Sequence, residues 1–163
     1  MASHEDIVKT YGQKLRTRVN GVLLEDENIL MVRHQSLGSG GYLWNVPGGG
    51  MEYGQSAEAA LKREFAEETG LKVKICDFLF VHELLIEPLH AIELFFMVEK
   101  TGGKLEIGLD PEMDEDKQII EDVRFMPWSE ISELAPDNKH NIFDKCKSLT
   151  DLVDKRGYFI FKK

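Results

Sequence analysis

Runs of apolar and polar positions predict strands on either side of one prominent helix. Residues 15–24 and 28–33 are rich in strand-forming residues and flank the acidic turn 25–27, and a shorter run over 42–46 ends at Pro-Gly-Gly-Gly. Ser56 as N-cap and Gly70 as the left-handed terminal residue bound a helix over 57–69. The other expected elements are helices over 4–12, 128–134 and 139–155, and strands over 73–86, 91–100, 123–126 and 158–161. Their order is not strictly βαβ, which predicts an α/β (α+β) fold: an α/β/α sandwich whose mixed sheet has helices on both faces.

The domain organisation follows from length and from the absence of linkers. The chain has 163 residues, about the size of one domain, and contains no internal repeat and no low-complexity tract. Hydrophobic residues make up 42% and charged residues 30%, which is typical of a globular protein. We therefore expect a single domain over 1–163, with its core over about 15–135 and a C-terminal helix and tail over 136–163.

Charge and cysteine content narrow the class of protein further. Asp and Glu number 29 against 20 Lys and Arg, a net charge of −9 that argues against binding a nucleic-acid polymer. No apolar run approaches the roughly 20 residues that span a bilayer, so we expect no membrane partner. Cys76 and Cys146 have no metal-ligand spacing, and no secretory signal is visible, which favours a reduced, cytoplasmic location.

The helix over 57–69 carries an unusual arrangement of acids. At about 100° per residue, Glu64, Glu67 and Glu68 share an arc of roughly 100°, directly beside the apolar Leu61 and Phe65. An ordinary amphipathic helix places its charges opposite the apolar stripe. The residues between the acids are the small Ala57 and Ala60, which predicts room for a bound group.

The position of these acids along the helix is also unfavourable without a cation. The helix dipole disfavours Glu67 and Glu68 in the last turn by about 0.3–1 kcal/mol each, and Glu64 and Glu68 repel each other at i, i+4. Clustered carboxylates suit a hard ion such as Mg²⁺ or Mn²⁺. The alternative is a solvated acidic face paired with lysines and arginines, and the helical wheel alone leaves both open.

Residues 49–71 resemble the Nudix box, the motif of the Nudix (MutT-like) hydrolases. The positions that match in register are Gly49, Arg63, Glu64, Phe65, Glu67, Glu68, Gly70 and Leu71. The preceding residues 44–49, together with Glu52 and Gly54, are also similar to the family. One position departs, because Gln55 stands where the family has a Glu that pairs with the motif Arg. Gln can keep a hydrogen bond to Arg63 without the charge, so we expect activity to survive.

The resemblance implies a metal-dependent pyrophosphatase that cleaves a nucleoside diphosphate linked to another group, X. Carried over by position, Glu64 and Glu68 are the main Mg²⁺ ligands, Glu67 is a third ligand or lies just behind them, and the backbone carbonyl of Gly48 completes the site. Arg63 orients the acids. Mn²⁺ is expected to substitute for Mg²⁺, and bound metal explains how an acidic pocket accepts an anionic substrate.

Several residues outside the motif are weaker candidates. Trp44 can stack on a base or pack in the core, and Arg33 can hold a phosphate or form a surface ion pair. With Glu52, they are the substrate-binding candidates. The acidic run 110–116 offers Glu112 or Glu115 as a general base, although a solvated loop is the commoner role for such a run.

Within the family, an ADP-ribose-like nucleotide sugar is preferred over an oxidised nucleoside triphosphate, because Pro88 lies near the place where some ADP-ribose-cleaving members have a Pro. The alternative from another class is a Nudix-fold module that binds a nucleotide without cleaving it. Such modules usually lose one of the metal-site acids, and all three are present here. Family habit predicts a homodimer.

Overall fold

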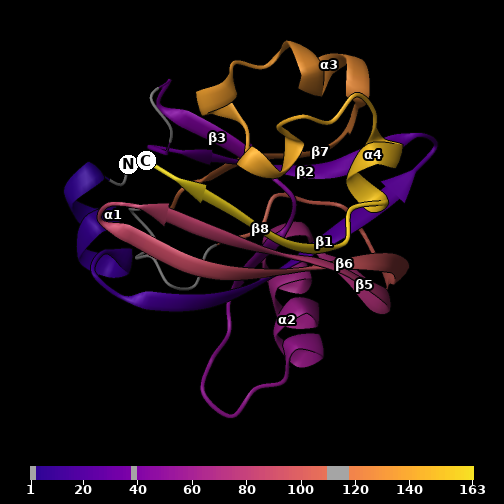
Figure 1. The fold of residues 1–163 in the computed structure, drawn as a ribbon. Coiled ribbons are helices and arrows are strands. Elements are labelled where there is room, and N and C mark those ends of the chain that lie inside the picture. The colour runs from indigo at the N-terminus through magenta and orange to yellow at the C-terminus, as the bar shows by residue number, and fades with distance from the viewer. Residues whose placement is uncertain (1–2, 38–39, 110–117) are drawn as a thin grey trace.

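Eight strands form one mixed sheet with helical segments on both faces (Figure 1), as predicted. The computed structural model describes residues 3–37, 40–109 and 118–163. Its elements are α1 (His4–Tyr11), β1 (Leu15–Glu25), β2 (Asn28–Gln35), β3 (Tyr42–Asn45), β4 (Gly48–Gly50), α2 (Ala57–Thr69), β5 (Leu71–Ile86), β6 (Leu89–Gly103), β7 (Ile120–Pro127), α3 (Trp128–Glu133), the 3₁₀ turns η2 (Pro136–Asn138) and η3 (Asn141–Phe143), α4 (Leu149–Val153) and β8 (Gly157–Lys162).

The sheet divides where β1 and β2 separate. These strands pair with each other only beside their turn, at Leu24–Ile29 and Glu25–Asn28. Beyond that point β1 pairs with β4 and, in parallel, with β6, whereas β2 pairs with β3 and β7. The order is β3-β2-β1-β6-β5-β8, with β4 on β1 and β7 on β2. The separation leaves two halves of the sheet facing a common space.

Alternating residues of β1 and β2 supply both sides of the core. Val19 and Leu30 point to the side covered by α2, where they pack with Phe65. Val22 and Ile29 belong to the opposite cluster, which the C-terminal segments cover. Figure 1 shows α2 on one side of the sheet and α3 and α4 on the other.

The short helix α1 closes one end of the molecule. Ser3 and Asp6 form a reciprocal capping box, which satisfies the free N–H groups at the helix start. Ile7 and Tyr11 are buried against Ile119, just before β7. The predicted helix over 4–12 is therefore confirmed within a residue at its end.

The predicted helix over 139–155 is wrong. Its apolar residues have helical spacing, but the chain forms only η3 and the five-residue α4 there. The N–H of His140 donates to the carbonyl of Trp44, which fixes this segment to β3, and Lys145 has a left-handed φ of 63° that interrupts a helix. Ser148 then caps α4 by accepting from the N–H of Asp151.

Among the described residues, no helix is long and apolar enough to cross a membrane.

Candidate active site

Helix α2 presents its acids to the glycine strand β4. The helix begins after Ser56, whose hydroxyl accepts from the N–H of Ala59, and ends at Gly70 with φ 70°, as predicted. Glu64 and Glu68 are 6% and 4% exposed. One carboxylate oxygen of Glu68 accepts from the N–H of Gly48 at 2.9 Å, so the helix and the strand meet directly at the acids.

Glycine is required at β4 because the backbone and the acids leave no space for a side chain. A Cβ added at Gly49 would lie 2.4 Å from both carboxylate oxygens of Glu64, and one at Gly48 would lie 2.1 Å from the carbonyl oxygen of Val19. Ala60, which was expected to leave room beside the acids, is instead fully buried in the core. The room for the carboxylates therefore comes from Gly49.

Arg63 joins the acids to the loop before the helix. Its guanidinium donates to Glu67 at 2.9 Å and to the carbonyl of Gly50 at 3.0 Å, and it lies 2.9 Å from Glu64. It also donates to the side-chain oxygen of Gln55 at 3.3 Å, which is the hydrogen bond expected of Gln at this position. Arg63 therefore orients the acids from the side of the loop.

Burial beside a second acid perturbs the ionisation of Glu64. Burial, reinforced by the negative charge of Glu68, raises the pKa of Glu64 to about 7, and Arg63 and Arg18 only partly oppose this rise. A negative charge on the buried Glu64 carboxylate is therefore costly. A bound cation would remove that cost.

The donor set fits a hard divalent ion. Glu64, Glu68 and Gly48 line one pocket, and together they offer carboxylate oxygens and a backbone carbonyl. All are oxygen donors, which Mg²⁺ and Mn²⁺ prefer over nitrogen or sulfur. Because Gly49 has no side chain, the Glu64 carboxylate occupies the space where a Cβ at position 49 would lie. Glu67 is half-buried and held by Arg63 at the edge of this group.

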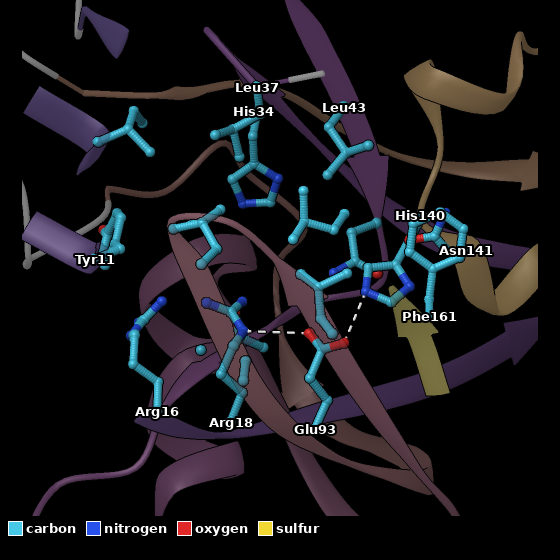
Figure 2. Close-up of a pocket in the computed structure, with 18 of the residues that line it drawn as sticks. Tyr11, Arg16, Arg18, His34, Leu37, Leu43, Glu93, His140, Asn141 and Phe161 are labelled. Atoms are coloured by element: carbon cyan, nitrogen blue, oxygen red, sulfur yellow. Dashed lines mark hydrogen bonds and ion pairs between the residues drawn. The ribbon is translucent and has the colours of Figure 1, made fainter. Parts of the chain in front are cut away.

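Glu64 and Glu68 line a cavity of about 370 Å³, within the usual range for small-molecule sites. Both halves of the sheet line it, with Arg18 and Glu93 from one half and His34 and Leu43 from the other (Figure 2). More of its wall is apolar than polar, and Tyr11 of α1 also lines it. The cavity therefore combines a pair of acids with apolar surface.

The predicted substrate-binding residues do not line this cavity. Trp44 is 4% exposed and packs in the core, with Arg124 over its ring at 5.0 Å. Arg33 lies over the ring of Tyr42 at 4.2 Å and pairs with Glu121 at 3.2 Å. Glu52 is exposed in the loop before α2. The structure thus gives Trp44 the packing role and Arg33 the ion-pair role. Glu112 and Glu115 lie outside the described residues.

Four polar residues that the motif did not indicate line the cavity instead. His34 is buried and lies 3.6 Å from Glu68. Arg18 lies 3.5 Å from the buried Glu93. Glu93 in turn contacts His140 at 2.9 Å. For these four residues the sequence offers one signal, the alternation of inward and outward positions along the strands that contain Arg18 and Glu93. No local pattern indicates that His140 lies beside Glu93.

Known proteins match this chain in sequence and in fold. The family model for the NUDIX domain matches residues 14–146. An ADP-ribose pyrophosphatase from Methanocaldococcus jannaschii is 30% identical over 128 residues, which cover 77% of this chain and 70% of that protein. The crystal structure of a UDP-X diphosphatase matches with a TM-score of 0.61 at 24% identity, covering 91% of this chain and 68% of that one. A NUDIX hydrolase from Nitrosomonas europaea matches with a TM-score of 0.66 at 18% identity, covering 86% of this chain and 87% of that one.

The two structures share the fold of this chain, and the family model spans most of its length, including β4, α2 and the acids between them. The resemblance drawn from residues 49–71 is confirmed: the chain belongs to the NUDIX family.

Proposed function

We propose that this protein hydrolyses the pyrophosphate bond of a nucleoside diphosphate linked to a second group, with an ADP-ribose-like nucleotide sugar as the preferred substrate class. The observation that carries the proposal is the pair of buried acids, Glu64 and Glu68, held against Gly48 and Gly49 in the wall of a cavity. The name of the archaeal relative, an ADP-ribose pyrophosphatase, supports the choice of substrate class.

The residues that would hold Mg²⁺ or Mn²⁺ are Glu64, Glu68 and the carbonyl of Gly48, with Glu67 beside them. A metal held there would supply positive charge that offsets the charge of the diphosphate and would make water a better nucleophile. The protein's own contribution is to hold the acids in position. Arg63 fixes Glu64 and Glu67 from the loop side, and the N–H of Gly48 fixes Glu68 from the strand side.

The rest of the cavity orients the substrate and excludes water. Arg18 and His34 bring nitrogen donors to the wall nearest the acids, where phosphate oxygens would lie. The apolar wall, which includes Leu37, Leu43 and Leu89, suits the less polar parts of a nucleotide. Binding at both ends holds the pyrophosphate bond near the acids, which raises the effective concentration of the reacting groups.

The test is a cleavage screen followed by mass spectrometry. The purified chain is incubated with ADP-ribose, NADH, UDP-sugars, diadenosine polyphosphates, and normal and oxidised dNTPs, with Mg²⁺ or Mn²⁺ and with or without EDTA. We expect metal-dependent cleavage of ADP-ribose, and none by Glu68→Gln, which excludes a contaminating enzyme. Stabilisation by a nucleotide without any cleavage would contradict the proposal and indicate a binding module.

A further inference from the structure

A row of polar side chains crosses three adjacent strands beside the candidate active site. Arg18 on β1 and Glu93 on β6 are register partners, and Glu93 is also the partner of His82 on β5. His140, between η2 and η3, reaches the same carboxylate from the C-terminal segment (Figure 2). Glu93 is 2% exposed and the two imidazoles are 4% and 5% exposed. A carboxylate this deeply buried requires hydrogen-bond partners.

The hydrogen bonds around Glu93 have a fixed direction. The N–H of Ile142 donates to Nδ1 of His140 at 3.1 Å, so the ring proton of His140 lies on Nε2, which faces Glu93 Oε2 at 2.9 Å. Nδ1 of His82 faces the same oxygen at 2.9 Å. Burial alone would raise the pKa of Glu93, but His140, His82 and Arg18 hold that pKa well below its usual range. Glu93 is thus an anion that accepts from two imidazoles.

The same three side chains have the composition of a metal site, and the hydrogen bonds argue against that role. A metal at Nε2 of His140 needs that nitrogen without its proton, whereas the bond from Ile142 keeps the proton there. The cluster is better explained as a hydrogen-bonded support.

What the cluster supports is Arg18. With both imidazoles on Oε2, the other oxygen of Glu93 faces Nε of Arg18 at 3.5 Å. The far end of the guanidinium donates to the carbonyl of Gly48 at 3.3 Å, next to the acids. Arg18 and Glu93 both line the cavity that contains Glu64 and Glu68. A free arginine side chain would occupy many rotamers, and ordering it on binding lowers affinity.

We propose that Glu93, supported by His82 and His140, is a positioning residue that holds the guanidinium of Arg18 ready to contact the diphosphate of the bound nucleotide. This inference rests on the proposed function, because it takes a nucleoside diphosphate as the occupant of the cavity. Glu93 itself contacts Arg18, and its effect on the substrate passes through that side chain.

The test is a double-mutant cycle on ligand binding. In Glu93→Gln, the amide oxygen still accepts from the two imidazoles, but the amide NH₂ then faces Arg18, donor against donor. The probe is α,β-methylene ADP, a diphosphate without a cleavable bridge, added with Mg²⁺ and measured by calorimetry. We expect Glu93→Gln to weaken binding roughly tenfold, Arg18→Gln at least as much, and the double variant no more than Arg18→Gln alone. Glu99→Gln, on the same strand but paired with the exposed Lys74, is the control and should bind normally.

Three results would overturn the inference. Unchanged affinity in Glu93→Gln is one, and an equal loss in the wild-type and Arg18→Gln backgrounds is another, because a general structural effect would not depend on Arg18. The third is stoichiometric zinc in the purified protein that disappears in His140→Gln, which would make the cluster a metal site.

Two further outcomes distinguish a folding defect and a loss of catalysis from a loss of Arg18 positioning. If Glu93→Gln does not fold, the Nε–H resonance of Arg18 is followed in the wild-type protein by nitrogen-15 NMR. Slow exchange that changes on adding the probe supports the inference, and an averaged, fast-exchanging signal overturns it. If the effects of Glu93→Gln and Arg18→Gln on probe binding are coupled but the wild-type chain cleaves no nucleotide, the proposed function is refuted and the inference stands. No binding of the probe by the wild-type chain refutes both.

Discussion

Replacing Glu64 by Gln is expected to stabilise the metal-free protein above neutral pH while removing its catalytic activity. Burial and Glu68 raise the pKa of Glu64 from its ordinary 4.5 to about 7. In the unfolded chain the same carboxyl ionises near its ordinary value. Between these two pKa values the folded protein binds more protons than the unfolded chain, so its stability falls as pH rises through this window. Gln has nearly the same shape and carries no charge, so it removes this dependence.

The size of the effect follows from the displacement of the pKa. One pKa unit corresponds to about 1.36 kcal/mol, so a rise from 4.5 to about 7 corresponds to about 3 kcal/mol at most. Most of that cost develops between about pH 5 and about pH 8.5. Over this range the stability of Glu64→Gln relative to wild type should therefore rise by about 2–3 kcal/mol.

The assay is urea unfolding in EDTA at both pH values, with Glu58→Gln as control because Glu58 is an exposed acid on the same helix. Adding Mg²⁺ at the higher pH should stabilise the wild-type protein and have much less effect on Glu64→Gln, since a bound ion stabilises only the state that binds it. If the stability difference between Glu64→Gln and wild type is the same at both pH values, Glu64 does not carry the perturbed pKa and the reasoning is refuted.

Three further substitutions test the rest of the site. Glu68→Gln should lower kcat by at least about 100-fold with little change in melting temperature, measured on the substrate found in the screen; near-normal turnover would remove Glu68 from the metal site. Gly49→Ala should weaken Mn²⁺ binding in a titration, because its Cβ would lie 2.4 Å from the Glu64 carboxylate. Gly102→Ala is its control, since the nearest atom to a Cβ there is 3.9 Å away, and equal Mn²⁺ affinity in both variants would contradict the geometry. Gln55→Glu places a charge opposite Arg63 on a half-exposed loop and should change kcat/KM by less than about tenfold, and a larger loss would show that the Gln contact is itself required.

The sequence predicts the part of the site that depends on local chemistry. Helix α2 begins and ends as predicted because its N-cap and its left-handed glycine are local signals. Gly49 and the acids stand at the spacing that the motif requires, so the contact between them could be predicted from residues 49–71 alone.

The support around Glu93 depends on contacts between distant parts of the chain, and the sequence offers no local signal for it beyond the strand phase of Arg18 and Glu93. Glu93 and His140 are 47 residues apart and meet through the packing of the C-terminal segment on the sheet. The same segment was predicted to be one helix, because apolar spacing alone does not reveal the bond from His140 to Trp44 that fixes it. Trp44 was a candidate for base stacking for a similar reason, since a buried aromatic and a ligand-facing aromatic have the same sequence pattern.

The separation of β1 from β2 has a consequence for how this protein could acquire new substrates. The hydrolytic end is built from regular elements, with β4 hydrogen-bonded to β1 and α2 packed on the sheet. Much of the opposite wall comes from α1 and from the chain between α3 and α4, which are short or irregular segments at the edge of the fold. Substitutions in those segments would reshape the wall that contacts the second group of the substrate, while leaving the acids and glycines in place. Retargeting by design should therefore begin at Tyr11 and Asn141, and leave the strands untouched.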